Sequence, residues 1–158
     1  MITGYRALIA ALALAACSLA PTGPGPTDGP LRMEAAIGRP ILAVGDTTDL
    51  VFRLLNTSAQ SVTLDFPSSC EVLPYIRVAD SDQVAYPTGG GWGCYPVLSQ
   101  LTIPAHDAHV VRVSLRGGAP QRAIYPETPI GVGRYVATAE VISSQYHLRS
   151  APVAFTVR

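Results

Sequence analysis

This 158-residue sequence has no surplus of basic side chains, no long apolar run and almost no methionine. Eleven arginines balance eleven acidic residues, and lysine is absent. Because phosphate-binding proteins carry a basic patch, we expect no nucleic-acid partner. The only methionines are Met1 and Met33, which excludes a methionine-rich copper site.

Motifs of hydrolytic enzymes are also missing. The sequence contains no Gly-x-Ser-x-Gly elbow, which places the nucleophile in α/β-hydrolases. The acidic residues are scattered, apart from Asp80 and Asp82 in an expected turn. A catalytic serine needs a base and an oxyanion donor held on rigid turns, and no residues mark such a set. We therefore predict that the protein is not an enzyme and needs no cofactor.

The three histidines are the remaining candidates for a metal site. In an extended strand His106 and His109 point to opposite faces, so they could bind one ion only if a turn intervenes. Pro104 and Asp107 favour such a turn, and His147 could then be a third ligand. A solvated turn is the simpler interpretation, and we predict no metal.

The N-terminus resembles a bacterial lipoprotein signal. Arg6 precedes the apolar run Ala7–Leu14, which is too short to span a bilayer as a helix. The small pair Ala15-Ala16 suits a signal peptidase, and Cys17 follows it directly, as in a lipobox. We predict a signal peptide over residues 1–16 and acylation of the Cys17 thiol. An ordinary secretory signal is the alternative.

The residues after Cys17 predict a location and a tether. An Asp directly after the lipid-modified cysteine would resemble an inner-membrane retention signal. This position is Ser18, which favours the outer membrane or the cell surface. Residues 17–30 are rich in proline and glycine, and such a segment buries too little surface to offset its ordering entropy. We expect a disordered tether there and a folded domain over residues 31–158.

Once Cys17 is assigned to lipid, Cys70 and Cys94 remain. One pair of cysteines in an exported chain predicts one disulfide. A metal pair and two free thiols are the alternatives. Zinc would require further ligands at suitable spacing, and these are missing nearby.

From Leu31 onward, apolar residues alternate with others at the period of half-buried strands. The predicted inward faces are Met33, Ala35 and Ile37; Leu50, Phe52 and Leu54; Val62, Leu64 and Phe66; Ile76 and Val78; Val111, Val113 and Leu115; Tyr135, Ala137, Ala139 and Val141; and Val153, Phe155 and Val157. A further strand is expected within Val97–Ile103. The turn formers Asn56 and Ser58 predict a hairpin between the second and third sets. Short strands separated by turns indicate an antiparallel β-sandwich.

Tyr135 is expected at a corner of this sandwich, because Gly133 lets the chain turn into its strand. A tyrosine at a corner can bury its ring while its hydroxyl bonds a backbone carbonyl.

Two loops could present a binding surface. The segment Pro87–Tyr95 holds Gly90, Gly91 and the only tryptophan, Trp92, and ends beside Cys94. Trp92 either anchors a partner together with Tyr95 or folds back over the end of the sandwich. The loop Gly117–Pro129 is long, and its Arg122 could enter the acidic pocket of a trypsin-like enzyme.

Six stretches of the sequence carry a family resemblance through their order along the chain. They are Phe52–Ser58, Val62–Phe66, Pro67–Cys70, Ile76–Asp80 followed by Tyr86, Leu101–Asp107, and Gly131–Ala139. Together they resemble the BsuPI-type intracellular proteinase inhibitor domain over about residues 46–142. The resemblance implies an immunoglobulin-like β-sandwich that inhibits serine proteinases, and it assigns no inhibitory residue. This chain differs from the family in its export signal and in its cysteine pair.

The sequence thus predicts an envelope-anchored module that binds a protein, with a serine proteinase as the partner implied by the resemblance. The alternative is a structural or assembly lipoprotein of the cell envelope without inhibitory activity. The candidate contact residues are Gly90, Gly91, Trp92, Tyr95 and Arg122.

Overall fold

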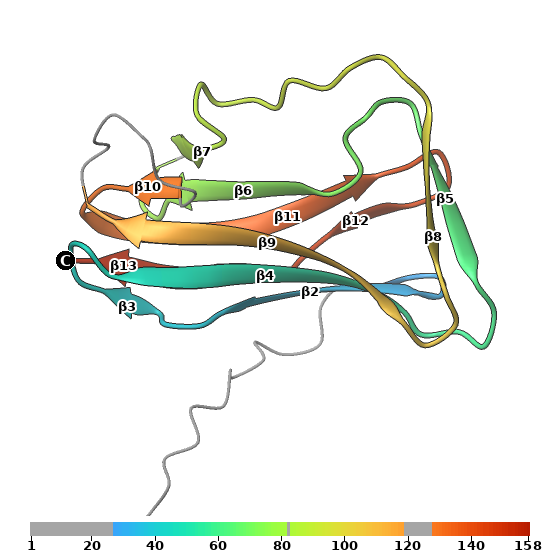
Figure 1. Cartoon of the computed structure of the whole chain (residues 1–158), viewed down its shortest axis with the longest axis horizontal. Helices are drawn as coiled ribbons and strands as arrows, with labels where there is room; N and C mark the ends of the chain where they lie inside the picture. The colour runs from blue at the N-terminus through green and yellow to red at the C-terminus, as the bar shows by residue number, and fades with distance from the viewer. Residues whose placement is uncertain (1–26, 82, 119–127) are drawn as a thin grey trace, which may run out of the picture.

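The computed structural model describes residues 27–81, 83–118 and 128–158, and all regular structure among them is β-strand. Two sheets face each other, and a short third pair stands across one end (Figure 1). The first sheet has the order β1 (Thr27–Asp28), β2 (Leu31–Ile37), β4 (Thr47–Asn56), β9 (Ala108–Gly117) and β10 (Thr128–Ile130). The second has the order β3 (Ile41–Leu42), β13 (Val153–Val157), β11 (Gly133–Ile142), β6 (Leu73–Val78) and β7 (Val84–Tyr86), with β12 (His147–Arg149) also pairing β11. The third consists of β5 (Val62–Phe66) and β8 (Ser99–Ile103).

The predicted antiparallel sandwich is confirmed. The pairs β2–β4, β4–β9, β6–β11 and β11–β13 are all antiparallel, and only the short edge strands β3 and β10 pair in parallel. The inward faces also agree with the alternation in the sequence. Fully buried side chains between the sheets include Leu50, Phe52 and Leu54 from β4, Ile76 from β6, and Ala137, Ala139 and Val141 from β11.

The predicted hairpin between Thr47–Asn56 and Val62–Phe66 is wrong. Strand β4 is a central strand, with β2 on one edge and β9 on the other. Both of its hydrogen-bonding edges are therefore occupied, and β5 pairs with β8 instead. In Figure 1 these two strands stand upright at the right-hand end of the sandwich.

Asn56 directs the chain away from a hairpin at this point. Its buried side-chain amide donates hydrogen bonds to the carbonyls of Gln60, Ile103 and Pro104, at 2.6, 3.1 and 3.0 Å. Its side-chain oxygen accepts the backbone N–H of Ser58 at 3.0 Å. A buried amide that is satisfied on both sides stabilises this path of the chain, because losing its partners would leave polar groups unpaired.

The predicted tether extends too far at its C-terminal end. Thr27 and Asp28 form β1, which pairs with Arg32 and Leu31 at the start of β2. Gly29 makes the intervening turn with φ +58°, a conformation that glycine adopts without steric cost. Leu31 begins β2 as expected. The predicted signal peptide, Cys17 and Arg122 lie outside the described residues.

Tyr135 occupies the corner that the sequence predicts. Tyr135 is 7% exposed, and its hydroxyl donates a 2.9 Å hydrogen bond to the carbonyl of Gly131. The ring stacks on Phe155 of the neighbouring strand β13, with centroids 5.3 Å apart. Both parts of the prediction, the buried ring and the bonded hydroxyl, are confirmed.

Candidate functional site

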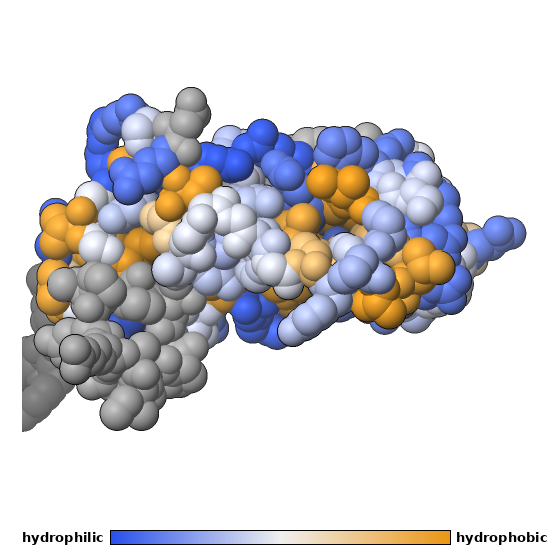
Figure 2. Space-filling view, turned by 90° about the horizontal axis from the view of Figure 1, so that it is seen from above, coloured by the Kyte–Doolittle hydropathy of each residue, from blue (hydrophilic) through white to orange (hydrophobic). Residues whose placement is uncertain are grey.

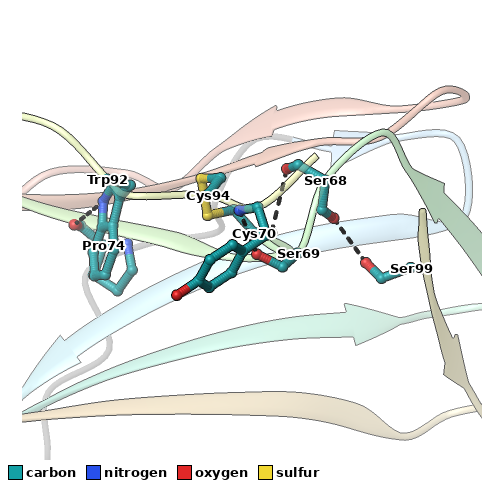
Figure 3. The surroundings of a disulfide bond; sticks show 8 residues. Ser68, Ser69, Cys70, Pro74, Trp92, Cys94 and Ser99 are labelled. Carbon is teal, nitrogen blue, oxygen red and sulfur yellow. Dashed lines mark hydrogen bonds between the residues drawn. A yellow bond between two sulfur atoms is a disulfide. The ribbon is translucent and has the colours of Figure 1, made fainter. Parts of the chain in front are cut away.

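A long connection between β7 and β8 runs along one side of the sandwich, at the top of Figure 1. It is crosslinked by the predicted disulfide, which is confirmed: Cys70 and Cys94 are bonded, with Cα atoms 5.5 Å apart and a sequence separation of 24. Cys70 lies just before β6, so the bond fastens the connection to the start of a core strand (Figure 3).

Hydrogen bonds fix the chain on both sides of this crosslink. The backbone N–H of Tyr95 donates to the Ser69 hydroxyl at 3.0 Å, and the Ser69 N–H donates to the Tyr95 carbonyl at 3.0 Å. Four residues further on, the Ser99 hydroxyl donates to the Ser68 carbonyl at 2.9 Å (Figure 3). The segment Cys94–Ser99 is therefore held at both ends by the loop that precedes Cys70.

Trp92 folds back onto the sandwich. Its indole N–H donates to the Pro74 carbonyl at 3.2 Å, and its ring meets Tyr86 edge to face, with centroids 5.4 Å apart. Strand β7 pairs with β6 only at Ile76 and Arg77, so the β6 edge at Pro74 has no partner strand in β7. The indole supplies the missing donor there. Burial also raises the pKa of the Tyr86 hydroxyl.

These contacts fit the interpretation that Trp92 closes the edge of the sandwich. We expect Trp92→Ala to lower the free energy of unfolding by about 2 kcal/mol, because a half-buried ring and one hydrogen bond are lost. Chemical denaturation measures this loss, and Trp92→Phe, which keeps an aromatic ring but loses the donor, is the matched control. A stable Trp92→Ala protein that had lost its partner would instead make Trp92 the anchor.

The other candidate residues of this loop point into solvent. Gly90 has φ +85°, and a Cβ atom built on Gly90 or Gly91 would meet no atom within 4 Å. Tyr95 is 74% exposed. Two residues outside the predicted contact set are also exposed: Val97 at 54% and Leu98 at 84%. They precede β8, whose ladder begins only at Ser99.

The segment that holds these exposed side chains contains no charged residue. No Asp, Glu, Lys, Arg or His occurs between Gln83 and Ala105. Figure 2 looks onto this side of the molecule and shows apolar areas separated by polar ones. Protein interfaces are depleted of charged residues at their centres, and covering such a segment removes no charge from water.

The histidines do not come together with other ligands. His106 lies in a turn with φ +57°, while His109 is in β9 and His147 in β12. Among residues 27–81, 83–118 and 128–158, no three or more His, Cys, Asp or Glu side chains gather closely enough to hold a metal ion. The same residues include no helix that is long and apolar enough to cross a bilayer.

No protein-family model and no curated protein sequence matches this chain. Among solved structures, the alkylpurine DNA glycosylase AlkC of Pseudomonas fluorescens, bound to DNA, has a TM-score of 0.43 at 13% identity, over 82% of this chain and 30% of that chain. A β-glucosidase from Erythrobacter marinus has a TM-score of 0.42 at 14% identity, over 81% and 16%. The C-terminal domain of wzt has a TM-score of 0.44 at 14% identity, over 89% and 80%. The chain spans less than a third of the first two, and likenesses this distant carry no argument about its function.

Proposed function

We propose that this protein is an exported, lipid-anchored module that binds another protein through the segment Tyr95–Leu98, and that it inhibits a serine proteinase as its resemblance to the BsuPI-type domain implies. The observation that carries the proposal is the exposure of three large apolar side chains, Tyr95, Val97 and Leu98, within four consecutive residues. Clustered exposed apolar residues mark interaction sites more often than single ones do.

The way this segment is held supports a binding role. The disulfide at Cys94 and the hydrogen bonds of Tyr95 and Ser99 fix its backbone before any partner arrives. Binding then orders fewer groups, so less of the contact energy is lost to entropy.

The strand order supports the immunoglobulin-like part of the proposal. In immunoglobulin domains the first, second and fifth main strands share one sheet, and the third, sixth and seventh share the other. Here β2, β4 and β9 lie together, and so do β6, β11 and β13. The short β3, which pairs in parallel with the last strand, fits the same arrangement.

An inhibition assay tests the proposed activity. The soluble domain, beginning at residue 18 so that no acylation occurs, is mixed with a panel of serine proteinases, and residual activity is titrated. We expect stoichiometric inhibition of at least one enzyme, with the inhibitor recovered uncleaved or cleaved at one bond. If the domain inhibits none of these enzymes and is digested at the rate of an ordinary folded domain, the result would favour the alternative, a structural or assembly lipoprotein.

The disulfide is compatible with a location outside the cytoplasm, where such bonds persist.

Within that location, we propose that the protein is held at a membrane by a lipid anchor. We expect Cys17→Ala to abolish acylation and to leave either an uncleaved precursor or a soluble product, because Cys17 supplies the acylated thiol. Membrane fractionation and mass spectrometry of the mature N-terminus measure this. Cys17→Ser is a closer control, since it changes one atom of the side chain. An unmodified N-terminus in the wild-type protein would contradict the anchor.

A further inference from the structure

We infer that Leu98 is the residue that enters the specificity pocket of the proteinase, and that this pocket is apolar. This inference rests on the proposed function. The partner class is therefore a serine proteinase of the chymotrypsin or subtilisin type, and not one with an acidic trypsin-type pocket. Four observations on Tyr95–Ser99 lead to this assignment.

Leu98 has the most exposed of the large apolar side chains in the described part of the chain, at 84%. Side-chain insertion into a pocket requires such exposure, and each buried methylene then contributes about 0.8 kcal/mol. Val97 at 54% and Tyr95 at 74% are less exposed.

The main chain of Leu98 is also free. Proteins that bind extended peptides pair with the main-chain N–H and C=O groups of a strand. Neither group of Leu98 makes a hydrogen bond within residues 27–81, 83–118 and 128–158. The next residue, Ser99, begins the β8 ladder opposite Phe66, so the free position lies at the entry to a fixed strand.

Tyr95 fails this second requirement although its side chain is exposed. Its N–H donates to the Ser69 hydroxyl, and its carbonyl accepts from the N–H groups of Ser69 and Val97 at 3.0 and 2.8 Å. A partner could not pair with this main chain without breaking these bonds. Leu98 therefore combines an exposed apolar side chain with unpaired main-chain groups, and Tyr95 does not.

The anchoring on each side of Leu98 suits an inhibitor more than a substrate. Cys94 is crosslinked to Cys70, and the Ser99 hydroxyl holds the Ser68 carbonyl. If a proteinase cut next to Leu98, both new ends would stay attached to the same loop. Because both chain ends then stay in the active site, they exclude water from it and the cut peptide bond can form again. The enzyme therefore stays bound to the inhibitor.

The absence of charged side chains from the segment indicates which class of pocket it suits. No charged side chain occurs from Gln83 to Ala105, so nothing within this segment could pair with the buried aspartate of a trypsin-type pocket. An apolar side chain in such a pocket would leave that aspartate unpaired, which is costly. An apolar pocket suits Leu98 without this cost.

A specificity switch tests the inference. Wild-type domain, Leu98→Arg and Leu98→Ala are titrated against chymotrypsin, subtilisin and trypsin. Val44→Arg is the matched control, because Val44 is 62% exposed and lies between β3 and β4, away from the disulfide loop. Thermal unfolding of each variant confirms that it is folded.

We expect the wild type to inhibit chymotrypsin or subtilisin and not trypsin. Leu98→Arg should weaken inhibition of the first two by about 100-fold and create inhibition of trypsin, while Leu98→Ala only weakens it. Val44→Arg should match the wild type. If the wild type inhibits but both Leu98 variants keep its profile, the inference is overturned and the proposed function stands. If the wild type inhibits no enzyme of the panel, both are overturned.

Discussion

Replacing Tyr135 with alanine is expected to lower the free energy of unfolding by about 3–5 kcal/mol, as large aromatic truncations in cores do. Tyr135 is 7% exposed, and its ring stacks on Phe155 across the β11–β13 pair. It also covers Gly133, where a Cβ atom would lie 3.2 Å from the tyrosine oxygen. Removing the ring would therefore leave a cavity bounded by backbone that cannot collapse easily.

Tyr135→Phe separates the two contributions of this residue. It keeps the ring and removes only the hydrogen bond from the hydroxyl to the Gly131 carbonyl, so we expect a loss of about 1 kcal/mol. Urea unfolding followed by circular dichroism measures both variants at a common m-value. A loss below about 1 kcal/mol for Tyr135→Ala would mean that the corner does not stabilise the sandwich.

The pH dependence gives a second readout of the same residue. Burial raises the pKa of the Tyr135 hydroxyl above its ordinary value of 10.0, so the folded state holds this proton more tightly than the unfolded state. Its contribution is complete below pH 10 and is lost as the pH rises through the higher folded pKa. Stability of the wild type should therefore fall above pH 10 more steeply than that of Tyr135→Phe.

The corner was predictable because its causes are local. Period-two alternation placed Tyr135, Ala137 and Val141 on one face, and Gly133 indicated the turn. The hairpin between β4 and β5 was predicted from equally local signals, the turn formers Asn56 and Ser58. It failed because strand pairing depends on which edges are free, and β2 and β9 had already taken both edges of β4.

The candidate site shows the same limit. The rarity of tryptophan singled out Trp92. Its position depends on the Pro74 carbonyl, which β7 does not pair and which accepts the indole N–H, and only the assembled sheet reveals this acceptor. Leu98 was overlooked because Val97–Ile103 alternates like a strand. The side chain of Leu98 is in phase with the exposed Gln100 and Thr102, so its outward direction follows from the alternation. Its free main chain follows from the point where the β5–β8 ladder stops, at Ser99, and no local pattern encodes that point.

Removing the disulfide is expected to have the second largest effect, a loss of about 3–4 kcal/mol in the free energy of unfolding. The bond closes a loop with a separation of 24 residues, and the chain-entropy model gives this magnitude for such a loop. The double variant Cys70→Ser/Cys94→Ser is compared with the wild type by urea unfolding, with and without reductant. Reductant should destabilise the wild type to the level of the variant and leave the variant unchanged.

The same variant separates the role of the crosslink in stability from its role at the binding segment. The hydrogen bonds from Ser69 to Tyr95 and from Ser99 to Ser68 do not involve sulfur, so the segment should keep its path in the folded variant. Inhibition measured well below the melting temperature should then weaken by about 10-fold, because one end of Tyr95–Leu98 is held less firmly. Cleaved inhibitor should also accumulate, since the Cys94 side of the cut is no longer crosslinked. Unchanged stability in reductant, together with two thiols that titrate in the native wild type, would contradict the crosslink itself.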